Sequence, residues 1–115
     1  MAVTFSRVKS ILDGAVAGWE ARTGRRANLF LHGPSFGWST REELLSSSAR
    51  GVMLVTASDI GQSAGRNSNL VKALVTGVPG FPRMPRGGPF LSDDSISEIV
   101  EWLDAGAPGD EVNGA

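Results

Sequence analysis

Cysteine is absent from this chain of 115 residues, and histidine occurs once, at position 32. Without thiols there are no disulfides, no thiolate metal ligands, no thioether-linked haem and no cysteine nucleophile. A single imidazole also removes most zinc sites and leaves a Ser-His-Asp triad with little support. The chemistry of the chain therefore depends on other residue types.

Long apolar runs are also missing, and no stretch approaches the length that spans a bilayer. The N-terminus enters helical periodicity without the basic region, apolar core and cleavage site of a secretion signal, so we expect a cytoplasmic protein with no membrane partner. The net charge of −1 gives no general attraction to nucleic acid. The length suits one domain, which we expect over residues 1–108, followed by a flexible tail at 109–115.

The best-defined predicted element is a terminal helix that begins after Ser92. The Ser92 hydroxyl can accept a hydrogen bond from an orphan backbone N–H, and the next two residues are aspartates at the positive end of the helix dipole. Apolar residues then recur at helical spacing, with Trp102 beside them: Ile96, Ile99, Val100 and Leu103. Gly106 and Pro108 end the helix.

Three more helices are predicted upstream. Residues 4–21 carry apolar side chains at steps of three or four, namely Phe5, Val8, Leu12, Ala15 and Trp19. Gly14 and Gly18 interrupt this helix and predict close approach of another backbone, with the terminal helix as the natural partner.

A capping-box pattern over residues 39–42 predicts a short helix at 40–47, with Leu44 and Leu45 facing inward. Asn67 is the expected cap of a helix over 68–76. Residues 51–57 have β-like composition but indicate a strand only weakly, and residues 58–65 read as a polar loop.

The loop before the terminal helix has the sequence Arg83-Met84-Pro85-Arg86-Gly87-Gly88-Pro89, and the helix ends Glu101-Trp102-Leu103-Asp104-Ala105-Gly106-Ala107. This combination resembles the C-terminal half of a class I cytochrome c domain. The resemblance implies an all-α fold of three to five helices with crossed first and last helices. It also places Met84 at the position of the distal haem ligand.

The resemblance fails at the haem attachment site. If the first helix is aligned with the family, Ala15-Val16-Ala17-Gly18-Trp19 occupies the Cys-x-x-Cys-His window. Both thiols are replaced by small residues, and the indole that replaces the imidazole has no lone pair for iron. We therefore expect no bound cofactor and a haem-free fold. The vacated space has to be filled by the chain's own aromatics, by a ligand or by a partner, because a large void costs stability.

Seven residues are candidates for a pocket or interface on this basis: Trp19, His32, Trp38, Phe81, Arg83, Met84 and Arg86. For five of them there is a structural alternative: space filling for Trp19, loop packing for His32, core packing for Met84 and plain solvated surface for the two arginines. Asp93, Asp94 and Glu98 resemble a metal cluster, but the dipole of the terminal helix explains them better.

The leading functional hypothesis is a non-catalytic accessory or interaction domain, not expected to be an enzyme by itself. Its expected partner is a protein, such as a subunit of a larger oxidoreductase. In electron-transfer relatives the rim around the haem edge docks the partner, and Arg83 and Arg86 would retain that role. Two alternatives stay open: a small enzyme or small-molecule binder that uses the vacated cavity, and a non-covalent b-type haem protein with Met84 and His32 as ligands.

Overall fold

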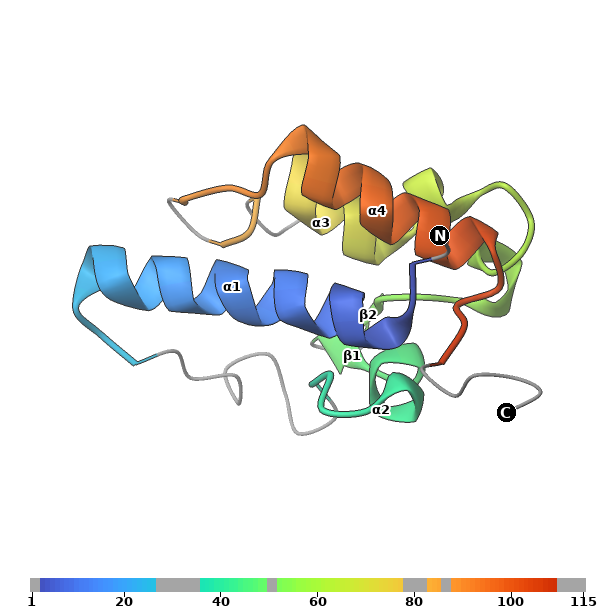
Figure 1. Ribbon diagram of the computed structural model, residues 1–115, viewed down its shortest axis with the longest axis horizontal. Coiled ribbons are helices and arrows are strands. Elements are labelled where there is room, and N and C mark those ends of the chain that lie inside the picture. Colours follow the sequence, from blue (N-terminus) through green and yellow to red (C-terminus); the bar gives the residue numbers. More distant parts are fainter. Residues whose placement is uncertain (1–2, 27–35, 50–51, 78–82, 86–87, 110–115) are drawn as a thin grey trace.

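A computed structural model of the chain describes residues 3–26, 36–49, 52–77, 83–85 and 88–109 (Figure 1). Four α-helices dominate this part of the chain: α1 (Phe5–Thr23), α2 (Arg41–Leu45), α3 (Asn69–Val75) and α4 (Asp93–Asp104). Between α2 and α3 lie the hairpin of β1 (Ser48–Ala49) and β2 (Val52–Met53) and two 3-10 turns, η2 (Ala57–Asp59) and η3 (Gly65–Asn67). The expected all-α class is confirmed.

The segment between α2 and α3 differs from its sequence prediction. In the described part of the β-like run, residues 52–57, only Val52–Met53 is strand, and it pairs antiparallel with β1 in the register Ser48 to Met53. The next two residues leave the hairpin and are buried in the core. The expected polar loop over 58–65 contains most of η2 and the start of η3, so this region is more ordered than its polar composition indicates.

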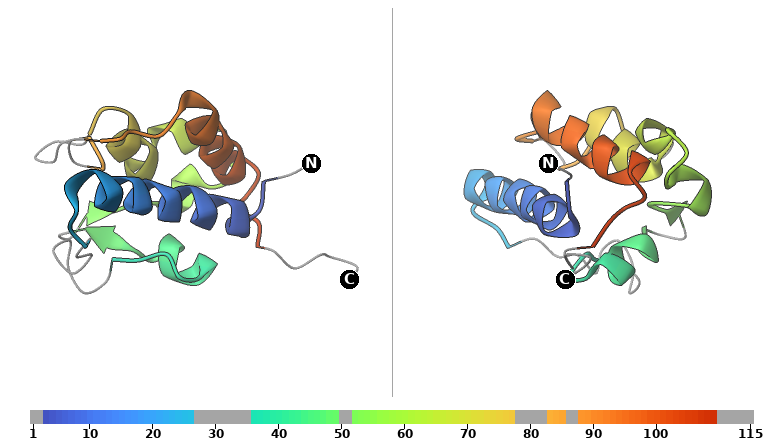
Figure 2. Two further views of the ribbon diagram at one scale, coloured as in Figure 1. Left: turned by 60° about the vertical axis from the view of Figure 1, so that its left-hand side comes forward. Right: turned by 45° about the vertical axis from the view of Figure 1, so that its right-hand side comes forward.

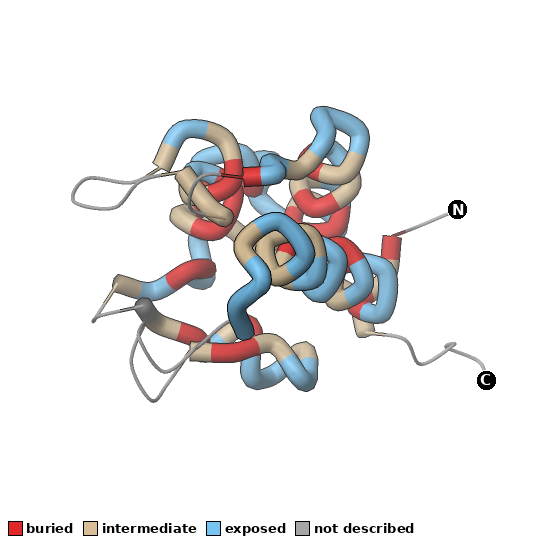
Figure 3. Tube along the Cα trace, turned by 90° about the vertical axis from the view of Figure 1, so that its left-hand side faces the viewer, coloured by how far each residue is buried: buried red, intermediate tan, exposed pale blue. Residues whose placement is uncertain are grey.

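Helix α1 is buried only in its first part. Its buried residues follow helical spacing and end at Ala15: Phe5, Val8, Ile11, Leu12 and Ala15. Trp19 was expected to continue this stripe, but it is only half-buried. Figure 3, which looks at the end where α1 finishes, shows its nearest turns as exposed or intermediate. The last two turns of α1 therefore lie outside the core.

Two predicted helix caps are displaced by one residue. The cap of α2 is Thr40, whose hydroxyl accepts from the Glu43 backbone N–H at 3.0 Å, so the predicted box over 39–42 is wrong. Likewise Ser68, not Asn67, caps α3 by accepting from the Val71 N–H at 3.1 Å. Adjacent polar residues offer near-equivalent caps, and tertiary packing selects between them. The predicted Ser92 cap of α4 is confirmed.

The first and last helices pack against each other, as expected. In Figure 1 α4 runs back along α1 in the opposite direction, and Figure 2 shows the two helices inclined to one another. The Phe5 ring lies 6.2 Å from the Trp102 ring, centroid to centroid. On the surface, Arg7 pairs with Glu98 at 2.8 Å.

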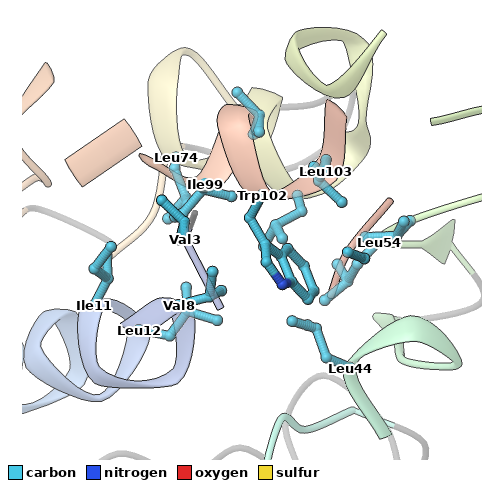
Figure 4. Close-up of a cluster of buried hydrophobic side chains, with 14 of the residues drawn as sticks. Val3, Val8, Ile11, Leu12, Leu44, Leu54, Leu74, Ile99, Trp102 and Leu103 are labelled. Carbon is cyan, nitrogen blue, oxygen red and sulfur yellow. The ribbon is translucent and has the colours of Figure 1, made fainter. Parts of the chain in front are cut away.

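Trp102 stands at the centre of the core. Its side chain is fully buried, and Figure 4 shows the indole between Val8 of α1, Leu44 of α2 and Leu54. The indole Nε1–H donates to the Pro108 carbonyl at 2.8 Å, and the same carbonyl accepts from the Phe5 N–H at 3.1 Å. The chain that follows α4 is thus joined to the start of α1.

Gly65 lets the η3 turn lie directly on α4. A Cβ at this position would come within 2.8 Å of the Leu103 Cβ and 3.1 Å of the Val100 carbonyl oxygen. The Gly65 N–H also donates to the Asp104 carboxylate at 2.9 Å. The prediction of close approach at Gly14 is wrong, because a Cβ there would meet nothing within 4 Å, and the neighbour of Gly18 is Pro89, not α4.

We expect Trp102→Phe to lower the free energy of unfolding by about 1–3 kcal/mol, because it removes a buried hydrogen bond and leaves part of the indole volume empty. Urea unfolding followed by circular dichroism measures the change. Trp38→Phe is the matched control: Trp38 is half-buried and bonded to an exposed carboxylate, so its loss should stay below about 1 kcal/mol. Equal losses in the two variants would contradict a central role for Trp102.

Gly65→Ala should destabilise the domain by about 2 kcal/mol or more, since the new methyl group collides with the backbone and a side chain of α4. Gly14→Ala makes the same chemical change on an exposed helix face, where alanine gains up to about 1 kcal/mol over glycine. Thermal and urea unfolding of the two variants should therefore move in opposite directions. A tolerated Gly65→Ala would mean that η3 does not contact α4 as described.

Candidate functional site

The predicted methionine loop is attached to helix α3. The Met84 N–H donates to the Ala73 carbonyl at 2.7 Å, and the Arg83 Nε–H donates to the Leu74 carbonyl at 3.0 Å. The Met84 side chain packs against the edge of the hydrophobic core. Met84 is thus a packing residue, and the hydrogen bond to Leu74 fixes the position of the Arg83 side chain.

Arg83 is not a simple solvated arginine. Its guanidinium carbon lies 4.1 Å from the centroid of the Phe90 ring, while Phe90 itself is 44% exposed. Sequence reasoning missed Phe90, because nothing in a pattern of single residues shows that two side chains seven positions apart will stack. We call the surface formed by Arg83, Met84, Pro89 and Phe90 the loop face.

The loop face lies against the second half of α1. Arg22 donates from Nε to the Gly88 carbonyl at 2.7 Å. A Cβ on Gly18 would come within 3.1 Å of the Pro89 Cγ, so the helix and the proline ring are in close contact. The window Ala15–Trp19 is therefore next to Pro89, the last residue of the methionine loop.

Of the other sequence candidates, two lie in the described residues and three lie outside them. Trp19 is half-buried near the end of α1, and its carbonyl accepts from the Thr23 hydroxyl at 2.9 Å. Trp38 belongs to a different surface. His32, Phe81 and Arg86 lie outside the part of the chain that the structure describes.

Trp38 lines a groove of about 400 Å³ beside α1. The groove is bounded by α1, by the segment 36–39 and by α2, and neither Trp19 nor Met84 belongs to its lining. Its lining residues are Lys9, Asp13, Val16, Ala17, Glu20, Phe36, Gly37, Trp38, Ser39 and Glu43.

Asp13 connects the two walls of the groove. Its carboxylate accepts from the Trp38 Nε1–H at 2.9 Å and from the Lys9 ammonium at 2.6 Å. Partial burial acts to raise the pKa of Asp13, but the hydrogen bonds from Lys9 and Trp38, together with the Lys9 charge, lower it below its ordinary value. Asp13 is therefore a carboxylate at neutral pH.

Glu43 forms the third side of the groove. One of its carboxylate oxygens accepts from both the N–H and the hydroxyl of Ser39, each at 2.6 Å. These two hydrogen bonds lower the pKa of Glu43. Glu43 is thus charged and turned toward the segment 36–39.

The acidic residues of α4 have structural roles. The helix dipole explains Asp93 and Asp94 but not Glu98. Asp93 and Asp94 lie in the first turn, where the positive end of the dipole favours them. Glu98 pairs with Arg7, whose hydrogen bond lowers the pKa of Glu98. Among the described residues, no group of three or more histidine, aspartate or glutamate side chains could hold a metal ion.

No helix in the described residues combines the length and the apolar character needed to cross a bilayer. Comparison of the chain with family models, with curated proteins and with solved structures finds no significant match. The function has to be argued from the two surfaces themselves.

We expect the indole N–H resonance of Trp38 to follow the titration of Asp13. Because the folded-state pKa of Asp13 is lowered, its contribution to stability is present above the ordinary pKa of 3.8 and is lost as pH falls through the lower folded value. The NMR signal should therefore move with a midpoint below 3.8. Asp13→Asn should abolish the transition, and Lys9→Met should raise its midpoint. An unchanged midpoint in both variants would show that the titration of Asp13 does not shift the Trp38 indole N–H resonance.

Proposed function

We propose that this chain is a haem-free, cytochrome c-like interaction domain that docks on a larger protein, an oxidoreductase subunit being the expected kind of partner. It binds through the loop face and carries no electrons itself. The observation that carries the proposal is the stacked Arg83 and Phe90 pair, with an aromatic ring 44% exposed on a fixed loop.

An isolated exposed apolar residue is ordinary surface, so exposure alone would not support a docking site. The loop face has three further properties. Its composition of arginine, methionine and aromatic side chains is the composition enriched in protein interfaces. Its backbone is held by hydrogen bonds to α3 and α1. The arginine is already stacked on the ring, so less conformational entropy is lost when a partner binds.

The charge around the loop face indicates an acidic partner. Arg83 belongs to this face, and Arg22 of α1 reaches it through the hydrogen bond to the Gly88 carbonyl. These two arginines favour a partner surface with carboxylates around an apolar slot for Phe90.

The order of elements supports the cytochrome c-like part of the proposal. The methionine loop joins α3 to a terminal helix that packs on α1, and the Ala15–Trp19 window lies beside the end of that loop. The interior between α1, α2 and α4 is occupied by the cluster around Trp102 (Figure 4). A core filled by the chain's own side chains is consistent with a haem-free domain.

We expect the double variant Arg83→Ala/Phe90→Ala to lose a specific protein partner. The immobilised chain is incubated with native extract of its source organism, and captured proteins are quantified by mass spectrometry. Loss of a hot-spot aromatic and its stacked arginine should reduce recovery of the partner about 30-fold or more. Recovery from the wild-type chain should also fall as salt is added.

The matched control is Arg66→Ala/Met53→Ala, which removes an exposed arginine and an exposed apolar side chain from another part of the surface. This variant should recover the same partner as the wild-type chain, and the purified partner should re-form the complex. Equal recovery by both double variants, or no captured protein at all, would overturn the proposal.

A further inference from the structure

The groove beside α1 is separate from the loop face and has no part in the docking proposal. Its floor is apolar, made by Val16 and Ala17 of α1 and by the rings of Phe36 and Trp38. The two rings meet edge to face, with centroids 5.5 Å apart and planes at 85°. Such a corner offers both a ring face and an apolar wall to a small molecule.

The aromatic corner is fixed from both sides. Asp13 accepts a hydrogen bond from the Trp38 indole at 2.9 Å. Behind the corner, the fully buried Ser47 hydroxyl accepts from the Gly37 N–H at 2.9 Å. A Cβ on Gly37 would come within 2.8 Å of the Glu43 carboxylate, so glycine allows Glu43 to close against this segment. The groove is therefore a preorganised surface.

The rim of the groove is anionic. Its charged lining residues are the carboxylates Asp13, Glu20 and Glu43 and one ammonium, that of Lys9. The Lys9 ammonium group already lies 2.6 Å from the Asp13 carboxylate. The rim of the groove therefore already binds an ammonium group of the chain itself. An exposed pair of this kind contributes little to stability, and a competing ammonium can displace it.

We propose that this groove binds a small organic cation, an ammonium group carried on an aromatic or aliphatic body. The body packs on Val16, Phe36 and Trp38, and the ammonium group takes the position at Asp13 that Lys9 now occupies. The volume of about 400 Å³ lies in the range of small-molecule sites. A hard metal cation is disfavoured because the apolar floor supplies no oxygen ligands.

The test uses the full chain and phenethylammonium as the probe, followed by the indole N–H resonance of Trp38, which Trp38→Phe identifies. The uncharged analogue phenethyl alcohol has the same aromatic body. We expect saturable shifts with phenethylammonium at millimolar concentrations and at least tenfold weaker binding of the alcohol, because only the ammonium group pairs with Asp13.

Lys9→Met removes the internal competitor and should tighten phenethylammonium binding about threefold or more, whereas Asp13→Asn should weaken it by a similar factor. Lys72→Met is the matched control, since it deletes the same charge from the exposed side of α3. Absence of a saturable shift overturns the proposal, and so does equal binding of the alcohol. Equal tightening in Lys72→Met would also overturn it, because the effect would then come from net charge alone.

Discussion

The hydrogen bond from the buried Trp102 indole to the Pro108 carbonyl is the constraint on which the fold depends. A buried indole N–H without an acceptor destabilises the folded state, and the acceptor here lies on the chain beyond the helix that carries the donor. The same carbonyl accepts from Phe5. Arg41 donates to the neighbouring Ala107 carbonyl and so ties in α2. The two adjacent carbonyls of Ala107 and Pro108 thus connect α1, α2 and α4.

The second half of α1 lies outside the core that these hydrogen bonds connect. No residue of the helix after Ala15 is buried, and that half contacts the loop at Gly88 and Pro89 through Arg22 and Gly18. The loop face contacts this half at Gly18 and Arg22, and Val16, Ala17 and Glu20 of the same half line the groove. The division of α1 into a core half and a surface half is therefore the link between the packing of Trp102 and the places where this domain can bind something.

Local signals predicted the local structure. Helix α4, its Ser92 cap and its apolar stripe follow from spacing and capping chemistry, which involve residues within four positions of each other. The errors concern contacts across the chain. Glycine at position 14 has the same local pattern as Gly18, but only Gly18 meets another segment. The sequence likewise shows Trp102 beside the stripe without showing that Pro108 will be its acceptor. The Arg83 stack on Phe90 and the Asp13 bond to Trp38 were not predicted for the same reason.

The two surfaces are chemically opposite and lie on opposite sides of one helix. Residues three, four and seven apart share a helix face, so Lys9, Asp13, Val16 and Glu20 point to the groove. Gly18 and Arg22 are offset by half a turn from that row and meet the loop. The groove has more carboxylates than ammonium groups, whereas the loop end of the molecule carries arginines. A cation in the groove would therefore neither block an acidic partner on the loop face nor compete for the same side chains, and the two surfaces can be occupied together.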